Sequence, residues 1–406
     1  MNNVLRIVIV DPNDTSRELL KVKLLSMDVA WLEAECSRYE FFADVVGQTH
    51  PDLGIINIDT EPAKAIRLLE NLRSVAPECS MIVVSSSADG QTILQAMRAG
   101  AKEFLTAPVK IEDLSSALER ISNMRGGRAD GKVRSCNVIT VAGATGGVGS
   151  TSVAVNVACA LAANSASTVA MVDLDLSLGD ADVLLDTIPD YTLIDVAQNI
   201  SRLDINLLKR SLTKHSSGLY LLPRPIQLQD AQQITPDDLN RVFTLMRATF
   251  SHLVIDISKS FSSLDMVAIT NCTHLLMVSQ LDLPCLRNVV RLMLSFDEVE
   301  GLKEKIKVVM NRVGLESRQI SLKKAQETIG REIFWQIPND YRTMVEVRNN
   351  GVPLIEQAPK AGLTQSIIGL ANAISGITES TEVQVEKEEV ASRNWLKFWP
   401  GRSKKS

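Results

Sequence analysis

Short apolar runs alternate with amphipathic stretches along residues 1–123. The runs at 4–10, 53–58, 81–84 and 103–107 predict buried strands. The segments between them, such as "TSRELLKVKLLSM" and "GQTILQAMRAG", repeat apolar residues at the spacing of helices. Strands that alternate with helices favour parallel βαβ units with helices on both faces of one sheet. The pattern therefore predicts a doubly wound α/β domain of the flavodoxin type.

A stretch rich in glycine and arginine, "NMRGGRADGKVRSC", interrupts this pattern, so residues 124–136 are predicted to link two domains. The alternation then restarts on a larger scale. Predicted strands lie at 138–143, 167–175, 218–223, 252–257, 274–279 and 305–311. They predict a second doubly wound parallel sheet over residues 137–378, a normal size for one α/β domain. Residues 379–406 lose the periodicity, and their acidic first part is expected to be disordered.

The composition narrows the functional classes. A formal net charge of −5 over 406 residues gives no general reason to expect a nucleic acid partner. The six cysteines form no CxxC pair and the four histidines are scattered, so we expect buried reduced thiols rather than disulfides or a zinc site. The N-terminus lacks the pattern of a signal peptide, and no apolar run reaches the length of a spanning helix. We expect a cytoplasmic protein.

The first strand of the second domain runs into a glycine-rich turn, "GATGGVGSTS", that precedes helix-forming residues. Gly146, Gly147 and Gly149 permit backbone angles that direct successive N–H groups at a phosphate. A helix that begins near Ser150 adds its N-terminal dipole. Thr151 stands where such loops place the hydroxyl that binds Mg²⁺. On this segment alone, a tight strand-to-helix turn without a ligand is the alternative.

Acidic residues end two of the following strands. Asp173 and Asp175 close one apolar run, and Asp256 closes another. Carboxylates at the carboxyl ends of parallel strands lie on the ligand-binding edge of the sheet. One can hold Mg²⁺ through water, and another can orient an attacking water. Each could instead cap a helix or a turn. Three acids in this order after the loop favour a nucleoside triphosphate site.

These motifs, with "VMNRVG" and "IPND…NNGVPL" further along, resemble the MinD/ParA group of deviant Walker-A ATPases over about residues 137–378. The resemblance implies ATP and Mg²⁺ as ligands and an ATP-dependent homodimer. It gives Asp175 the role of the catalytic, water-orienting acid, and it places Thr151, Asp173 and Asp256 at the metal. The nucleotide-binding residues that it implies are Gly146, Gly147, Val148, Gly149, Ser150, Thr151, Ser152, Asn311, Arg312 and Pro338.

The loop departs from the pattern of that group at both of its lysines. Thr145 replaces the signature lysine that reaches into the partner subunit, and Ser150 replaces the lysine that grips the phosphates. A charge-assisted contact to phosphate contributes about 1.5–3 kcal/mol, so its loss weakens binding by about tenfold to a hundredfold. Phosphoryl transfer depends even more on positioning and electrostatics. We therefore expect nucleotide binding with slow or absent hydrolysis.

Residues 1–123 resemble a response-regulator receiver domain without its chemistry. "RIVIVDPND" keeps one acid of the usual pair, Asp11. Asn57 occupies the phospho-acceptor position, and Ala107 replaces the lysine that stabilises the phosphorylated product. Because an amide cannot accept a phosphoryl group as a carboxylate does, no phosphorylation is expected. A signalling receiver that uses Asp59 is the alternative, although two residues further along move that acid past the strand end.

A receiver of this kind joined to a lysine-free deviant Walker-A domain resembles the CpaE/TadZ family of Flp (tight adherence) pilus assembly proteins over nearly the whole chain. The resemblance implies a scaffold that localises the pilus secretion machine, with the secretion ATPase and other Flp/Tad components as partners. It implies a cytoplasmic position, peripheral at the inner membrane or the cell pole. Two alternatives stay open: an active MinD-like ATPase that cycles on and off a membrane, and a two-component regulator.

The final residues, "NWLKFWPGRSKKS", combine aromatic and basic side chains. Such a mixture suits a membrane interface, but the apolar part is short and Pro400 stops a helix. We expect at most weak membrane association through this tail. A disordered tail or a partner-docking motif is the alternative.

Overall fold

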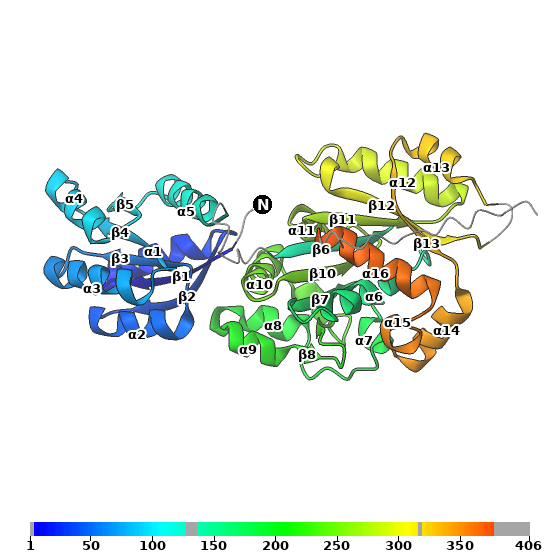
Figure 1. Ribbon diagram of the computed structural model, residues 1–406, viewed down its shortest axis with the longest axis horizontal. Coiled ribbons are helices and arrows are strands. Elements are labelled where there is room, and N and C mark those ends of the chain that lie inside the picture. Colours follow the sequence, from blue (N-terminus) through cyan, green and yellow to red (C-terminus); the bar gives the residue numbers. More distant parts are fainter. Residues whose placement is uncertain (1–3, 127–135, 316–318, 377–406) are drawn as a thin grey trace, which may run out of the picture.

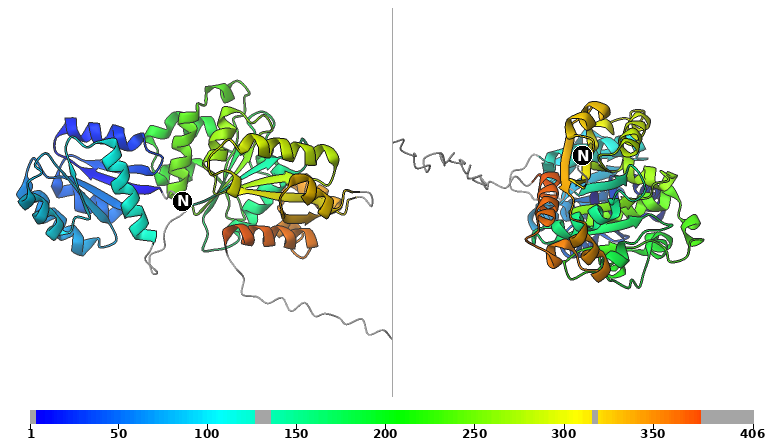
Figure 2. Two further views of the ribbon diagram at one scale, coloured as in Figure 1. Left: turned by 90° about the horizontal axis from the view of Figure 1, so that it is seen from above. Right: turned by 90° about the vertical axis from the view of Figure 1, so that its right-hand side faces the viewer.

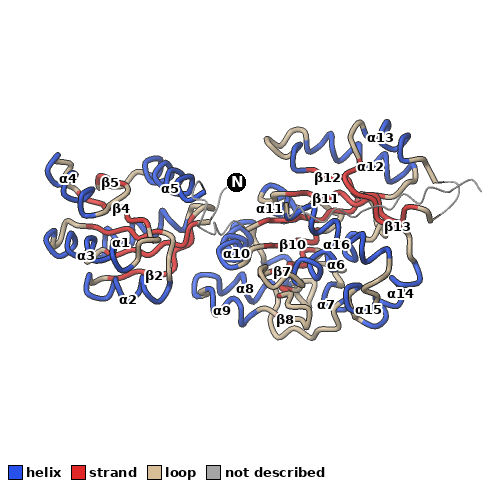
Figure 3. The backbone as a smooth tube through the Cα atoms, viewed as in Figure 1, coloured by secondary structure: helices blue, strands red, loops and turns tan. Residues whose placement is uncertain are grey.

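The computed structural model of the chain describes residues 4–126, 136–315 and 319–376. Two sheets follow one another along the chain, each sandwiched between helices (Figure 1). Figure 3 shows the strands as a central layer in each half, with helices on the outside. The predicted doubly wound α/β class is therefore confirmed for both halves. The predicted tail and most of the predicted linker lie outside the described residues.

The first sheet has five strands in the order β2-β1-β3-β4-β5, all parallel. The strands are β1 Leu5–Val10, β2 Ala30–Cys36, β3 Leu53–Asn57, β4 Ser80–Ser85 and β5 Glu103–Thr106. The helices are α1 Asp14–Leu25, α2 Tyr39–Thr49, α3 Pro62–Val75, α4 Gly90–Ala99 and α5 Ile111–Gly126. Val8 and Val10 enter one core and Ile7 and Ile9 the other, because successive side chains of a strand point to opposite faces.

Two sequence predictions for this half need correction. The edge strand β2, "AWLEAEC", was not predicted, because its middle residues are only half-buried and include glutamates that break the apolar run. The helix α5 continues through Gly126, so the segment predicted to link the domains from residue 124 begins as helix.

The second sheet has eight strands in the order β13-β12-β11-β6-β10-β7-β9-β8. They are β6 Asn137–Gly143, β7 Val169–Leu174, β8 Thr213–Lys214, β9 Tyr220–Leu222, β10 His252–Ile257, β11 His274–Ser279, β12 Ile306–Val313 and β13 Ile333–Pro338. All pairs are parallel except the edge pair of β8 with β9, so the predicted fully parallel sheet is wrong at that edge. The other edge strand, β13, is mostly half-buried, and the apolar pattern did not predict it.

The helices of this half are α6 Ser150–Ala162, α7 Ala181–Leu184, α8 Leu193–Asn199, α9 Ile205–Ser211, α10 Pro236–Thr249, α11 Ser263–Thr270, α12 Leu283–Phe296, α13 Leu322–Ile329, α14 Tyr341–Asn350, α15 Leu354–Gln357 and α16 Gly362–Ser375. Helix α6 is buried on most sides, because it lies between the sheet and α16. Its Asn156 accepts a hydrogen bond from the N–H of Leu354 (2.8 Å) and so ties α15 to α6.

The two halves meet where β2 of the first contacts α10 of the second. Val4 and Trp31 from the first half join a buried apolar cluster of the second. The left-hand view of Figure 2 places the first half at one end of the second, beside α10. Across the three described ranges, no helix combines the length and the apolar character needed to cross a membrane.

Candidate functional site

The glycine-rich turn leaves the central strand β6 and enters α6 at the carboxyl edge of the second sheet. Gly147 and Gly149 have φ values of +77° and +92°, a region that side chains other than glycine rarely adopt. Gly149 is the N-cap residue of α6, and no side chain caps the helix. The first N–H groups of α6 are therefore left to an outside acceptor, and the helix dipole favours an anion there.

A side chain from β12 holds this loop in place. The amide of Asn311 donates a hydrogen bond to the carbonyl of Val148 (2.7 Å). Its Nδ2 atom lies only 2.7 Å from where a Cβ on Gly149 would stand, so glycine is needed for this approach. Asn311, which the resemblance implied as a base contact, thus also positions the loop. The Val148 side chain is buried in the core, so only its backbone can reach a ligand.

A cleft with two joined halves runs beside the loop. One half is lined mainly by apolar side chains of β13, α14 and α16, including Pro338, Tyr341 and Met344. The other half is lined by the loop and the start of α6, together with polar and charged side chains. Gly149, Ser152, Arg312 and Arg348 line both halves. An apolar slot that continues into a set of free backbone N–H groups suits a planar base followed by phosphates.

The structure brings together many, but not all, of the predicted site residues. Those that line the cleft are Gly147, Gly149, Ser150, Thr151, Ser152, Asn311, Arg312 and Pro338. Gly146 and Val148 belong to the loop but do not line the cleft, and the three aspartates do not line it either. Sequence reasoning missed Arg348. The only available signal was its position immediately before the "NNG" that carries part of the family resemblance.

Thr145 and Ser150, which stand where the family has lysines, both have their hydroxyls close to other atoms of the protein. The hydroxyl of Thr145 lies 3.2 Å from the Cys285 sulfur. The hydroxyl of Ser150 is buried, 3.0 Å from where a Cβ on Gly143 would stand. The loop itself therefore contributes backbone N–H groups and hydroxyls but no cation to the cleft.

Two buried acids lie side by side behind the loop. Asp173 of β7 and Asp256 of β10 are partners in the sheet register, and both are almost fully buried. Asp173 accepts hydrogen bonds from the N–H groups of Asp175 (3.1 Å) and Ala181 (3.2 Å). Within the described residues, neither carboxylate oxygen of Asp256 has a hydrogen-bond partner. Buried acceptors are seldom left unpaired in native proteins, so this carboxylate points to a missing cation or water.

Burial shifts the titration of both acids. It raises the pKa of Asp173 to about 7, with backbone hydrogen bonds opposing the shift in part. It also raises the pKa of Asp256 well above its ordinary value; the neighbouring Asp173 adds to this shift and the nearby Thr151 hydroxyl opposes it. A divalent cation would reverse both shifts by favouring the charged forms. The unpaired oxygens of Asp256 therefore fit a Mg²⁺ ion bound through water.

The remaining ligands of such an ion would have to be neutral groups, water or phosphate. Among the residues that the structure describes, no three His, Cys, Asp or Glu side chains converge as a metal site. Thr151, the first-turn hydroxyl of α6, lines the cleft next to Ser150. Asp175 is half-buried, and its carboxylate accepts the N–H of Leu178 (3.2 Å) in a local turn. The predicted acids Asp173 and Asp256 are thus neighbours, and Asp175 lies directly after the end of β7.

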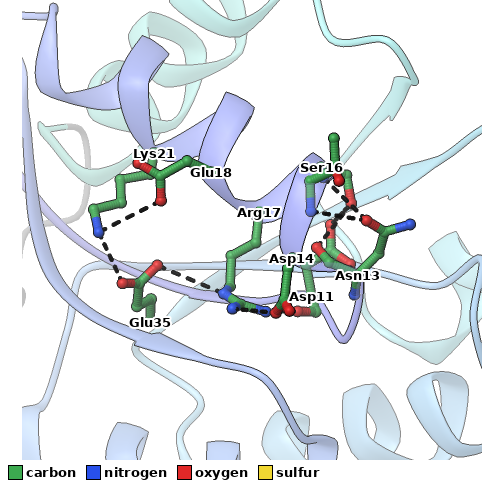
Figure 4. Close-up of polar contacts among 9 residues, drawn as sticks. Asp11, Asn13, Asp14, Ser16, Arg17, Glu18, Lys21 and Glu35 are labelled. Atoms are coloured by element: carbon green, nitrogen blue, oxygen red, sulfur yellow. Dashed lines mark hydrogen bonds and ion pairs between the residues drawn. The ribbon is translucent and has the colours of Figure 1, made fainter.

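In the first domain, protein donors already satisfy both carboxylate oxygens of the buried Asp11. Asp11 accepts the N–H of Asn13 (2.9 Å) on one oxygen and the amide of Asn57 (2.9 Å) and the Ser16 hydroxyl on the other. Figure 4 shows Asp11, Asn13 and Ser16 of this cluster at the start of α1, beside the ion pairs of Arg17 and Lys21 with Glu35. Because protein donors already occupy both oxygens of Asp11, this site does not fit a magnesium ion as a phosphorylating receiver requires.

Asp59, the alternative phospho-acceptor, is engaged as well. It lies beyond the end of β3 and accepts hydrogen bonds from the Ser85 hydroxyl (2.6 Å) and the Ser86 N–H (2.8 Å). Ser85 occupies the place of the switch hydroxyl in the receiver resemblance. Its proton is donated inside the domain, and Ala107 offers no cation for a phosphorylated product.

We predict that the first domain is not phosphorylated. Incubation of the full chain with acetyl phosphate and Mg²⁺ should leave its intact mass unchanged, because the acceptor position carries Asn57 and the nearby acids are hydrogen-bonded. A receiver with an aspartate at that position serves as the positive control. A species heavier by one phosphoryl group would contradict the prediction, and its loss in Asp59→Asn would identify the acceptor.

Comparison with known proteins matches both halves to family models. Residues 7–119 match the response regulator receiver domain, and residues 139–352 match the CobQ/CobB/MinD/ParA nucleotide binding domain. The septum site-determining protein MinD of Thermotoga maritima is 27% identical over 250 residues, which cover 59% of this chain and 88% of that protein.

Solved structures agree with this assignment for the second half. A ParA family ATPase from Chlorobium tepidum superposes with a TM-score of 0.56 at 26% identity, covering 59% of this chain and 98% of that one. The septum site-determining protein MinD from Pyrococcus horikoshii, solved as a complex with Mg-ADP, has a TM-score of 0.51 at 21% identity over 59% of this chain and 96% of that one. The second likeness is one of fold.

Proposed function

This chain belongs to the CobQ/CobB/MinD/ParA nucleotide-binding domain family, and we propose that its second domain binds Mg·ATP and hydrolyses it slowly or not at all. One observation carries the proposal: the start of α6, which follows a lysine-free glycine turn, has no side-chain cap, and the unpaired buried Asp256 lies close to its Thr151. The backbone N–H groups there form the proposed phosphate cradle and support ground-state binding. The absence of the loop lysines weakens the stabilisation of charge that develops during phosphoryl transfer.

The proposed roles divide among the loop, the acids and the cleft. The N–H groups from Gly147 to Thr151 hold the phosphates, and the apolar half around Pro338 holds the base. Mg²⁺, when bound, would neutralise phosphate charge, held by the Thr151 hydroxyl and through water by Asp173 and Asp256. Asp175 would orient a water in any residual hydrolysis.

We further propose that nucleotide binding controls homodimerisation, and that the dimer is a scaffold that localises a Flp/Tad type IVb pilus secretion machine. The support is a receiver whose buried Asp11 is already hydrogen-bonded by Asn57, joined to a nucleotide domain whose loop lacks lysine, as in the CpaE/TadZ resemblance. The proposed partners are the pilus secretion ATPase and other Flp/Tad components. The proposed position is at the inner membrane or the cell pole, on the cytoplasmic side.

A second candidate is an active MinD-like ATPase that cycles on and off a membrane. Three cations favour this ATPase, because they line the phosphate half of the cleft and could replace the loop lysines in catalysis as well as in binding. They are Lys259, Arg312 and Arg348. The two candidates differ in turnover and not in nucleotide affinity.

Calorimetric titration with Mg·ATP, run beside a phosphate-release assay, separates the two functions. The scaffold proposal expects saturable binding with turnover far below about one per second, the low end for ordinary enzymes. Turnover at or above that rate would favour the ATPase. No binding at millimolar Mg·ATP would leave the domain without a nucleotide role.

The pilus role has its own test in cells that lack this protein. Complementation with the wild-type chain should restore surface pilin, and a chain that cannot bind nucleotide should not. An Asp175→Ala chain, impaired only in residual hydrolysis, is the matched control and should restore pilin if turnover is dispensable.

A further inference from the structure

The cations of the nucleotide cleft all come from outside the phosphate loop. Lys259 follows β10, Arg312 lies in β12 and Arg348 lies in the last turn of α14, and the three line the phosphate half together with one acid, Asp180. Three cations against one acid leave this half positive. A cleft of this charge beside a ring of backbone N–H groups attracts an anion.

Arg348 is presented by a firmly held helix end. Asp340 caps the start of α14 by accepting the N–H of Thr343 (3.1 Å). Val347 is buried, and Gly351 ends the helix with a φ of +64°. A Cβ on Gly351 would stand 2.5 Å from the Cβ of Asp186, so the helix end lies tightly against the segment after α7. This packing fixes the backbone from which the Arg348 side chain extends.

The guanidinium groups of Arg312 and Arg348 have no counter-ion among the residues that the structure describes. In the part of the chain that the structure describes, neither makes a hydrogen bond or an ion pair through its side chain. Arg342, on the same helix as Arg348, pairs with Glu346 instead (3.4 Å) and does not line the cleft. The two arginines of the cleft are therefore free to take a ligand anion.

The positions of the three cations differ along the cleft. Arg312 and Arg348 line both the apolar half and the phosphate half, so they stand at the junction where a nucleoside would join its phosphates. Lys259 lines the phosphate half alone, and its charge also acts on Asp256. Lys259 is thus placed toward the end of the phosphate chain, near the buried acids.

We propose that these side chains replace the missing loop lysine: Arg312 and Arg348 bind the phosphates next to the nucleoside, and Lys259 binds the terminal phosphate of a triphosphate. The inference rests on the proposed function, because a nucleotide must enter this cleft with its base in the apolar half. It goes beyond that function by naming the charges that hold each part of the phosphate chain.

The test is calorimetry of the full chain with Mg·ADP and with Mg·ATP, for the wild type and three variants. Arg348→Gln should weaken both ligands about tenfold, the low end of what a charge-assisted phosphate contact contributes. Lys259→Gln should weaken Mg·ATP by about threefold to tenfold and leave Mg·ADP unchanged, since only the triphosphate reaches it. Arg342→Gln, the matched control on α14, should change neither, and all four melting temperatures should agree.

A compensating variant tests whether Arg348 does the work of the loop lysine. Ser150 lines the phosphate half, so a lysine there can extend into it. Adding Ser150→Lys to Arg348→Gln should recover most of the lost affinity, which a merely structural role for Arg348 would not allow.

The outcomes distinguish this inference from the function it rests on. Wild-type affinity in Arg348→Gln would overturn the inference and leave the nucleotide-binding proposal standing. Equal loss in Arg342→Gln would also overturn it, because the effect would then reflect general surface charge. A Lys259→Gln variant that loses ADP and ATP alike would remove the assignment to the terminal phosphate. A wild-type chain that binds neither nucleotide would overturn both proposals.

Discussion

Replacing Gly147 by aspartate should abolish Mg·ATP binding while the protein stays folded. The φ of +77° at this position already costs a residue with a side chain about 1–2 kcal/mol, although aspartate tolerates this region better than most. No atom lies within 4 Å of the position that a Cβ would take, so a steric clash is not the cause. The carboxylate would stand in the phosphate cradle and repel the ligand. Calorimetry should show at least a hundredfold loss of affinity, about 3 kcal/mol.

Gly147→Asn is the matched control for this experiment. Asparagine has the same shape and backbone preference but no charge, so it should retain measurable binding if charge repulsion is the cause. Gly330→Asp controls for stability, because Gly330 also has a positive φ (+73°) and open space but caps α13 away from the cleft. Wild-type affinity in Gly147→Asp would mean that phosphates do not occupy the cradle. Equal losses in the aspartate and asparagine variants would assign the effect to shape.

The central strands of both sheets were predictable because burial on both faces leaves nearly continuous apolar runs. In β6 and β10 this pattern, followed by glycines or an aspartate, identified the loop and the acids from sequence alone. The edge strand β2 gave no such signal, since glutamates interrupt its apolar run. The edge strand β13, "IFWQIP", was also missed, although only one glutamine interrupts its apolar residues. Sequence patterns therefore gave the middle of each sheet more reliably than its edges.

The parts of the site that sequence did not predict depend on contacts between distant segments. Nothing near the loop indicates that Asn311, more than 160 residues away, donates to the Val148 carbonyl. Arg348 is one of many arginines in helices, and only the packing of Gly351 against Asp186 shows that it is held over the cleft. In the first domain, Asn57 at the acceptor position predicted the absence of phosphorylation, but nothing in the sequence indicated that its amide donates a hydrogen bond to Asp11.

Because of the buried acids, we also expect the stability of the nucleotide-free protein to depend strongly on pH. Burial raises the folded-state pKa of Asp173 from 3.8 to about 7, and it shifts that of Asp256 in the same direction. An acid with a raised folded pKa binds its proton more tightly in the folded state. The destabilisation that comes from ionising this buried acid is therefore absent below about pH 4, grows as pH rises, and is complete above about pH 7. For Asp173 the shift corresponds to about 4 kcal/mol. Without nucleotide and Mg²⁺, the chain should therefore melt at lower temperature at pH 8 than at pH 5.

Asp256→Asn should consequently stabilise the nucleotide-free protein at pH 8 and weaken its use of Mg²⁺. The amide removes a buried charge whose oxygens accept no hydrogen bond in the described structure. The free energy of unfolding in EDTA should therefore rise by a few kcal/mol, and the melting temperature by about 5–10 °C for a domain of this size. The same variant should bind Mg·ATP no better than metal-free ATP.

Asp265→Asn is the matched control, and its expected change in stability has the opposite sign. Asp265 is equally buried, but it accepts the N–H groups of Ser258 (3.0 Å) and Ser262 (2.7 Å), so its replacement should destabilise the fold. The prediction fails if the melting temperature depends on pH identically in the wild type and in Asp256→Asn. That result would show that a counter-charge already neutralises Asp256 and that the carboxylate needs no bound cation.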